Sequence, residues 1–208
     1  QASKEELIKK ITQKKEFSKL PEKDVELAFK QFEKRQVSEE EKIRLTRELL
    51  HKVFGAFTSQ KLLSPKDKDK EWILRKHLST RERLPYYEEL YRKILSDYKG
   101  QKIAIIDLGA GVNGFSYNYF QDFNFKVDYF AIESMGQLVE LMNNYFEREK
   151  LNAEAIHESL FELEKIKKII TETKKPRIIF LFKVLDSLEM IERDYSKNIL
   201  KEIVPLAD

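Results

Sequence analysis

The segment from Lys102 to Gly114 reads KIAIIDLGAGVNG. Its first seven residues are mostly apolar and rich in β-branched side chains, which is typical of a buried parallel strand. The remainder is a loop in which Gly109, Gly111 and Gly114 let the backbone come close to a ligand. The segment therefore predicts a strand that runs into a ligand-binding loop.

Strands and helices are expected to alternate after this loop. Further strands are predicted at 127–132, 153–156 and 177–182, and helices at 136–150, 163–173 and 191–203. This alternation predicts an α/β protein with a parallel, Rossmann-like sheet. Doubly wound sheets usually have more than four strands, and a fifth is expected where the sequence reaches Asp208. We therefore expect the core to lack its C-terminal strands.

The first 99 residues predict only helices. Ser3 and Glu6 fit a capping box, Pro21 opens a second helix, and Ser38 caps a third. The predicted apolar face of the third helix consists of Leu45, Leu49, Val53, Phe54 and Phe57. A polar turn is expected at 64–70, and further helices at 72–77 and 85–98. The chain thus divides into a helical region, 1–99, and a core, 100–208.

The composition excludes several kinds of site. The 208 residues include no cysteine, so disulfides, thiolate metal ligands and cysteine nucleophiles are excluded. Three scattered histidines make a metal site unexpected. No apolar run approaches the roughly 18 residues of a membrane-spanning helix, and the charged N-terminus does not resemble a signal peptide. We expect a cytoplasmic monomer without metal or membrane contact.

The net charge of +3 conceals an asymmetry. Residues 1–100 hold 25 Lys and Arg against 18 Asp and Glu, whereas residues 101–208 hold 14 against 18. A basic half beside an acidic half is typical of a protein that contacts a polyanion with one part. Solvated amphipathic helices of a lysine-rich protein would give the same pattern.

Two cofactors compete for the glycine loop. Gly109, Gly111 and Gly114 spell GxGxxG, and Glu133 ends the next strand, where dinucleotide-binding folds place an acid on the ribose. Asp107 favours a different ligand. A carboxylate there repels an anionic pyrophosphate but suits the ammonium and sulfonium groups of S-adenosyl-L-methionine. The loop therefore favours S-adenosyl-L-methionine over NAD, with a glycine turn that binds nothing as the third interpretation.

A segment with two arginines precedes the core. Residues 77–84 read HLSTRERL, which predicts a helix start capped by Ser79 or Thr80. An arginine in this turn suits a bidentate contact with the methionine carboxylate of the cofactor. A solvated helix start would have the same sequence.

Five segments of the chain carry a combined pattern: ELIKKITQKKEF at 6–17, LHKVFGAF at 50–57, HLSTRER at 77–83, IDLGAGVN at 106–113 and IFLFKVLDSL at 179–188. Together they resemble the Arm/Rmt family of 16S rRNA guanine-N7 methyltransferases, which confer aminoglycoside resistance. The segments occur in the family's order and span most of the chain. The sequence departs from the family pattern at Ala110, Gly114 and Asp186, where the family has cysteine, proline and proline.

The resemblance implies a class I, Rossmann-like methyltransferase core that binds S-adenosyl-L-methionine. It implies that Arg83 holds the cofactor carboxylate and that Glu133 takes the ribose hydroxyls. Phe182 and Lys183 are the implied catalytic residues, where target and methyl group meet, although Lys183 also fits an ordinary strand-end lysine. The other implied cofactor-binding residues are Asp107, Gly109, Ala110, Gly111, Asn113, Ser134, Glu158 and Ser159, with His157 beside them.

The resemblance also gives the basic helices a role on the 30S ribosomal subunit, where they would contact phosphates of the 16S rRNA. The implied RNA-binding residues are Lys9, Lys10, Lys14, Lys15, Lys34, Arg35, Arg44, Arg47 and Lys52. Two alternatives stay open. One is an inactive RNA-binding or ribosome-associated protein with the same fold, which the departures from the family pattern favour. The other is an NAD-dependent oxidoreductase, which only the glycine spacing favours.

Overall fold

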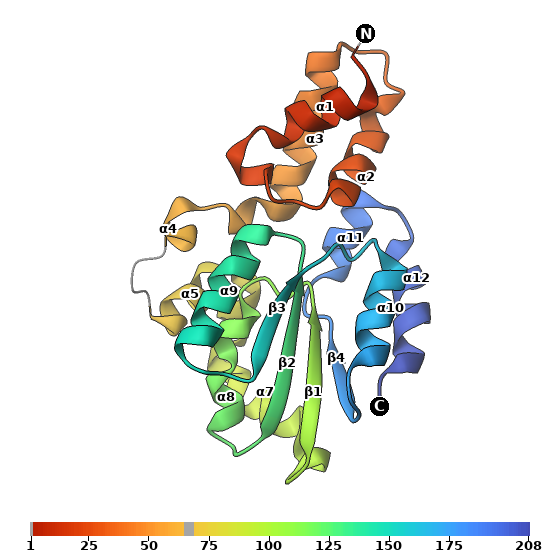
Figure 1. Cartoon of the computed structure of the whole chain (residues 1–208). Coiled ribbons are helices and arrows are strands. Elements are labelled where there is room, and N and C mark those ends of the chain that lie inside the picture. Colours follow the sequence, from red (N-terminus) through yellow and green to blue (C-terminus); the bar gives the residue numbers. More distant parts are fainter. Residues whose placement is uncertain (1, 65–68) are drawn as a thin grey trace.

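The computed structural model describes residues 2–64 and 69–208, and a parallel sheet lies at its centre (Figure 1). Among these residues the sheet has four strands in the order β3-β2-β1-β4. They are β1 (Lys102–Leu108), β2 (Lys126–Glu133), β3 (Ala153–His157) and β4 (Arg177–Phe180). The predicted α/β class and the four predicted strands are confirmed, with β4 ending two residues earlier than expected.

The central strand explains the apolar segment that begins at Lys102. β1 pairs with β2 on one side and with β4 on the other, and it is buried from Ile103 to Leu108. Successive side chains point to opposite faces of a strand. Accordingly, Ile103 and Ile105 belong to one hydrophobic core, whereas Ile106 and Leu108 belong to a second. A strand buried on both faces needs the nearly continuous apolar run that the sequence shows.

Helices cover both faces of the sheet (Figure 1). The first core packs against α9 and the shorter helices near it, and the second core packs against α10, α11 and α12. The helices on the first side are α4 (Gln60–Leu63), α5 (Lys70–Lys76), α7 (Tyr87–Ile94), α8 (Asn118–Gln121) and α9 (Gly136–Arg148). Those on the second side are α10 (Leu163–Glu172), α11 (Leu185–Ile191) and α12 (Tyr195–Ile203).

The helices α1 (Lys4–Thr12), α2 (Glu22–Glu33) and α3 (Glu39–Phe54) form a lobe beyond the carboxyl ends of the strands (Figure 1). Hydrogen bonds attach this N-terminal lobe to the core. Gly136 donates its N–H to the carbonyl of Lys19 at 3.1 Å, and the Gln31 amide donates to the carbonyls of Met190 and Ile191 at 2.9 and 2.8 Å. The lobe therefore lies over the sheet edge at which α/β folds bind ligands.

Local signals predicted the helix starts of the lobe correctly. Ser3 and Glu6 form the reciprocal capping box, with bonds of 3.2 and 2.9 Å. The Ser38 hydroxyl accepts the Glu41 N–H at 3.2 Å, and Pro21 directly precedes α2. These caps depend on residues within one turn, which is why the sequence alone reveals them.

The predicted apolar face of the third helix is confirmed in part, because Leu49, Val53, Phe54 and Phe57 pack half-buried against the cores. The buried residues of α3 are Thr46 and Leu50, whereas Leu45 is only partly buried. Thr46 donates its hydroxyl to the carbonyl of Lys42 at 2.8 Å, so a polar residue is accommodated in the core without a lost hydrogen bond.

Other helix predictions were wrong in their bounds. The segment predicted to be helical at 85–98 breaks into a 3-10 turn (Leu84–Tyr86), α7 and a second 3-10 turn (Ser96–Tyr98). The helix predicted at 191–203 is α12 alone, preceded by the unpredicted α11 and by Asp194 with φ of 63°. Further 3-10 turns lie at Lys15–Phe17, Gly55–Phe57, Asn113–Ser116 and Val204–Leu206.

The HLSTRER segment forms α6 (Leu78–Arg83), but neither predicted residue caps it. His77 stands at the N-cap position without a side-chain cap, and the Thr80 hydroxyl donates to the Leu74 carbonyl instead. Residues 65–68 of the predicted polar turn lie outside the described residues. Within the described ranges, none of the helices has the length and apolar character that crossing a bilayer requires.

Candidate functional site

A cavity lies at the carboxyl edge of the sheet, between the glycine loop, α6, α11 and the N-terminal lobe. The predicted site residues that line it are Arg83, Gly109, Ala110, Gly111, Glu133, Ser134, Phe182 and Lys183. Asp107, Asn113 and Ser159 are buried and Glu158 is half-buried, and these four predicted residues do not line the cavity. The structure therefore brings together side chains from segments that are up to 100 residues apart in the sequence.

Two glycines of the loop are required by its geometry. Gly109 and Gly111 have φ of 69° and 58°, a conformation that other residues adopt only with strain. A Cβ at Gly109 would lie 2.3 Å from Cγ2 of Val184, and one at Gly111 would lie 2.9 Å from Cε1 of Phe57. The third glycine, Gly114, packs against α9 instead. These two glycines thus keep the loop close to the cavity.

Glu133 is fixed by the main chain at the cavity wall. Its two carboxylate oxygens accept the N–H groups of Gly111 at 2.8 Å and of Met135 at 3.0 Å. Burial raises the pKa of Glu133, and these backbone hydrogen bonds oppose that shift. Each oxygen retains a further lone pair. Glu133 can therefore accept hydrogen bonds from a ligand without moving.

Asp107 belongs to a buried network beneath the loop. One of its oxygens accepts the Asn113 amide at 2.7 Å and the Tyr129 hydroxyl at 2.6 Å. The Tyr87 hydroxyl donates to Oδ1 of the Asn113 side chain at 2.6 Å. Burial raises the pKa of Asp107, and the bonds from Tyr129 and Asn113 together with the charge of Arg83 lower it. Asp107 therefore orders the loop from below, and the tyrosines that assist it were not predicted.

Arg83 has a buried N–H group without a partner. Its guanidinium donates to the Ser79 hydroxyl at 2.6 Å and to the Asn113 side chain at 3.2 Å, and lies 4.6 Å from the ring centre of Phe182. Its Nε is buried and makes no hydrogen bond, and none of the described carboxylates forms an ion pair with it. Such a donor is costly unless a ligand accepts from it. Arg83 thus fits an anionic ligand group.

Lys183 lies at the cavity lining with a partner of its own. It follows β4 with φ of 54°, a strained conformation for a residue other than glycine, and its side chain is largely exposed. Its ammonium forms an ion pair with Glu82 of α6. Phe182 packs against Phe180 in a tilted arrangement, with ring centres 4.6 Å apart. The two predicted catalytic residues therefore connect β4 to the HLSTRER segment.

Two side chains that were not predicted also line the cavity. The imidazole of His77 stacks on Phe57 with ring centres 4.0 Å apart, and its Nε2 is buried without a partner. Burial lowers the pKa of His77 to about 4, so the imidazole is neutral at pH 7. Asp24 reaches the cavity from α2 of the lobe. In the sequence Asp24 looks like an ordinary acid in the first turn of a helix.

The residues at the end of β3 support the wall near Asp24. The Ser159 hydroxyl donates to Asp24, and the Glu158 carboxylate accepts the Ser159 N–H at 3.0 Å. The His157 ring nitrogen Nε2 lies 2.8 Å from the Ser134 carbonyl oxygen, within hydrogen-bond distance. His157, Glu158 and Ser159 were predicted beside the adenine of a cofactor, and Ser134 as a further cofactor-binding residue. Ser134 lines the cavity, and Ser159 is linked to it through Asp24, whereas His157 and Glu158 are not part of its lining.

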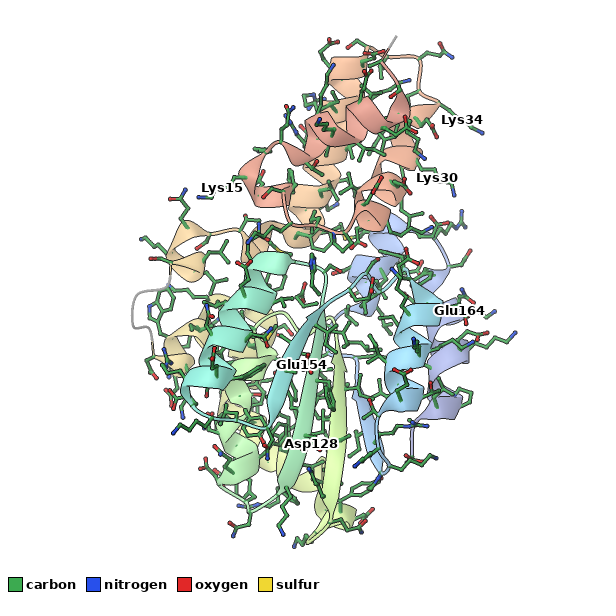
Figure 2. The ribbon with its side chains drawn as sticks, in the orientation of Figure 1. Lys15, Lys30, Lys34, Asp128, Glu154 and Glu164 are labelled. Carbon is green, nitrogen blue, oxygen red and sulfur yellow. The ribbon has the colours of Figure 1, made fainter. Side chains whose placement is uncertain are left out.

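The predicted RNA-binding residues differ in how free their charges are. Arg44 forms ion pairs with Glu41 and Glu48, and Arg47 donates to the main-chain carbonyls of Lys10 and Ile11. Lys14 pairs with Glu16, at 2.6 Å. Lys9, Lys10, Lys15, Lys34, Arg35 and Lys52 are exposed. Lys15 and Lys34 extend from opposite sides of the lobe (Figure 2).

No group of three acidic or histidine side chains among the described residues is placed to hold a metal ion.

No family model and no curated protein sequence matches this chain.

Solved structures do resemble it. The 16S rRNA methylase RmtB superposes with a TM-score of 0.75 and 17% identity, over 95% of this chain and 79% of RmtB. This chain shares the α/β, Rossmann-like fold of that methylase. The 16S rRNA methyltransferase RmtF, solved with S-adenosyl-L-homocysteine, gives a TM-score of 0.72 and 19% identity, over 97% of this chain and 78% of RmtF. An rRNA methylase from Escherichia coli gives 0.67 and 17%, over 95% and 78%. The predicted resemblance to the Arm/Rmt enzymes is thereby confirmed at the level of the fold.

Proposed function

We propose that this chain is an S-adenosyl-L-methionine-dependent methyltransferase that modifies 16S rRNA, at guanine N7 in the decoding region of the 30S subunit. The unpaired Nε–H of Arg83, in a cavity that also contains the fixed carboxylate of Glu133, carries the proposal. The cofactor has a carboxylate at its methionine end and ribose hydroxyls at its adenosine end. The two protein groups match these two ligand groups in chemistry.

Each cavity wall has a role in this proposal. Arg83 holds the methionine carboxylate, and Asp107 and Asn113 keep Arg83 and the loop in position beneath it. Gly109, Ala110 and Gly111 let the cofactor approach the main chain. Ser134, Glu158 and Ser159 form the adenine end. When bound, the cofactor supplies a methyl group on a positively charged sulfur.

The target base would enter beside Phe182 and Lys183. Guanine N7 attacks with a lone pair and loses no proton, so the protein has only to align the reacting atoms and exclude water. The rings of Phe57 and Phe182 provide apolar walls for this purpose. The neutral imidazole of His77 offers one more polar contact, because its Nε2 faces no protein partner.

The N-terminal lobe would dock on the rRNA. It lies over the same edge of the sheet as the cavity, and its exposed lysines suit phosphate contacts. In this proposal the chain is a divergent, monomeric and cytoplasmic member of the Arm/Rmt family, with residues 1–99 as RNA-docking region and 100–208 as catalytic core.

Calorimetry on the whole chain tests the cofactor half of the proposal. We expect binding of S-adenosyl-L-homocysteine, and a loss of about tenfold or more for Arg83→Lys, which keeps the charge but removes the planar fork. Arg81→Lys, in the same helix but outside the cavity, is the matched control. Absence of binding by the unaltered chain would refute the proposal.

Transfer of a tritiated methyl group to purified 30S subunits tests the second half. If the labelled 16S rRNA is cleaved after treatment with borohydride and aniline, guanine N7 is the methylated atom, because this chain cleavage requires an N7-methylated base. RNA binding without label would instead support the inactive RNA-binding protein, which the engagement of Lys183 by Glu82 favours. Binding of NAD in the same calorimeter would support the oxidoreductase.

A further inference from the structure

Asp24 is a buried carboxyl group whose hydrogen-bond partners are hydroxyl groups. It belongs to the first turn of α2 in the N-terminal lobe, yet it lines the cavity and is 1% exposed. The Ser159 hydroxyl donates to one of its oxygens, and the Ser134 hydroxyl is its second polar neighbour. Among the described residues no lysine or arginine forms an ion pair with it.

A role in helix stability does not require this burial. Glu22 occupies the same first turn, remains exposed, and serves the helix dipole equally well. A carboxylate in a buried position is costly to ionise, and burial raises the pKa of Asp24 to about 6. Buried acids that face a cavity without a cation are typical of ligand-binding positions. A carboxylate has about four lone-pair sites, so the two hydroxyl donors leave Asp24 able to accept a further hydrogen bond from a ligand.

The surroundings of Asp24 indicate the shape of that ligand group. Leu160 and Phe161, which follow β3, and Leu188 and Ile191 of α11 line the same cavity. α11 is in contact with α2, so these apolar side chains belong to the part of the cavity next to the lobe. An apolar slot with one polar acceptor suits a flat aromatic base that carries an N–H donor.

We propose that Asp24 accepts a hydrogen bond from the exocyclic amine of the adenine ring, and so makes the N-terminal lobe part of the cofactor site. The inference rests on the proposed function, since it assumes that the cavity binds S-adenosyl-L-methionine. Glu133 accepts hydrogen bonds from the ribose hydroxyls, whereas Asp24 accepts one from the adenine base. The lobe that docks on rRNA thereby contacts the cofactor directly.

This arrangement selects adenine over hypoxanthine. Hypoxanthine has a carbonyl oxygen where adenine has the amine, and a carboxylate repels that oxygen. Asparagine at position 24 has nearly the same size, but its amide offers both an acceptor and a donor. The substitution Asp24→Asn therefore removes the repulsion without removing the side chain.

The test compares S-adenosyl-L-homocysteine with S-inosyl-L-homocysteine by calorimetry on the whole chain at pH 7.5. We expect the unaltered protein to prefer the adenosyl ligand by about tenfold to a hundredfold, the range for a hydrogen bond to a charged group. Asp24→Asn should bring the ratio of the two dissociation constants close to one. Glu22→Gln, an exposed acid of the same turn, should leave the ratio unchanged.

The ratio separates reading of the base from support of the fold. Equal weakening of both ligands by Asp24→Asn would show that Asp24 only supports Ser159, and would overturn the inference. Asp24→Ser is the second variant and should also lose the preference, because it lacks the carboxylate. If the unaltered chain binds neither ligand, the proposed function itself fails. If it binds both with equal affinity, the inference alone fails.

Discussion

The core and the N-terminal lobe each contribute a carboxylate to one cavity, and they hold it in different ways. Main-chain N–H groups of the glycine loop and of the segment after β2 fix Glu133. Asp24 is held by side-chain hydroxyls, across the boundary between lobe and core. The core thus presents a rigid acceptor formed within one βα unit, whereas the acceptor from the lobe exists only when lobe and core are docked.

The largest expected effect concerns the acceptor of the core. Glu133→Ala should weaken binding of S-adenosyl-L-homocysteine at least about a hundredfold, because it removes the ribose acceptor and leaves two N–H groups of the loop region unpaired. Isothermal calorimetry measures this loss. Glu154→Ala, an exposed acid of the neighbouring strand (Figure 2), is the control and should bind normally. If Glu133→Ala changes the dissociation constant less than threefold, Glu133 is not the rigid ribose acceptor that we infer, and it would no longer differ from Asp24 in this respect.

The same distinction explains what the sequence could reveal. Glu133 and the loop are predictable because a β-branched run, closely spaced glycines and a strand-end acid all follow from residues near one another in the chain. Asp24 was missed because only tertiary packing buries it. His77 was missed for the same reason: its stacking partner, Phe57, comes from the lobe side of the cavity.

The errors in secondary structure also have physical causes. α11 was missed because its short apolar pattern ends at Ile191, and Asp194, with φ of 63°, breaks the chain before α12. Thr46 was missed as a buried residue of α3 because its hydroxyl forms a hydrogen bond within the helix. Periodicity arguments treat such a residue as solvent-facing.

The second prediction concerns the free-energy cost of ionising Asp24, the carboxyl group that the lobe contributes to the cavity. The pKa of Asp24 is about 6 in the folded protein against 3.8 in the reference state, so the folded protein binds this proton more tightly than the unfolded chain does. The stability contributed by the neutral form is therefore present below pH 4 and is lost as pH rises through 6. Burial is the main cause of the raised pKa of Asp24; the charge of Glu133 adds to it, and Ser159, Ser134 and His157 oppose it.

Asp24→Asn removes this titration. The variant should gain up to about 3 kcal/mol in the free energy of unfolding at pH 7 relative to the unaltered protein, and the gain should vanish near pH 4. Urea denaturation at both pH values measures the difference. A variant that is less stable at pH 7 would mean that the ionised carboxylate is itself a structural requirement. The expected combination of higher stability with poorer ligand discrimination is typical of a functional residue.

The third prediction concerns the loop that fixes Glu133. Gly100 and Gly111 both have positive φ, but a Cβ at Gly100 meets nothing within 4 Å, whereas one at Gly111 meets Phe57. Gly100→Ala should therefore lower the free energy of unfolding by only about 1 kcal/mol, which is the cost of backbone strain. Gly111→Ala should lower it more and should also weaken cofactor binding. The double variant with Phe57→Leu should recover part of the additional loss, and equal losses at the two glycines would contradict the close approach of lobe and loop.

The smallest expected effect lies on the surface of the lobe, where the charges are either free or already engaged. Lys34→Ala should weaken binding to 16S rRNA a few-fold. It should also make the slope of log affinity against log salt concentration shallower by about one, because one fewer phosphate is neutralised. Arg44→Ala should change neither quantity, because Glu41 and Glu48 already neutralise that guanidinium. Filter binding over a series of salt concentrations measures both. A larger effect for Arg44→Ala than for Lys34→Ala would mean that the RNA displaces Glu41 and Glu48 from Arg44. The contribution of a basic residue to RNA affinity would then depend on where it lies on the lobe, and not on whether it forms an ion pair in the free protein.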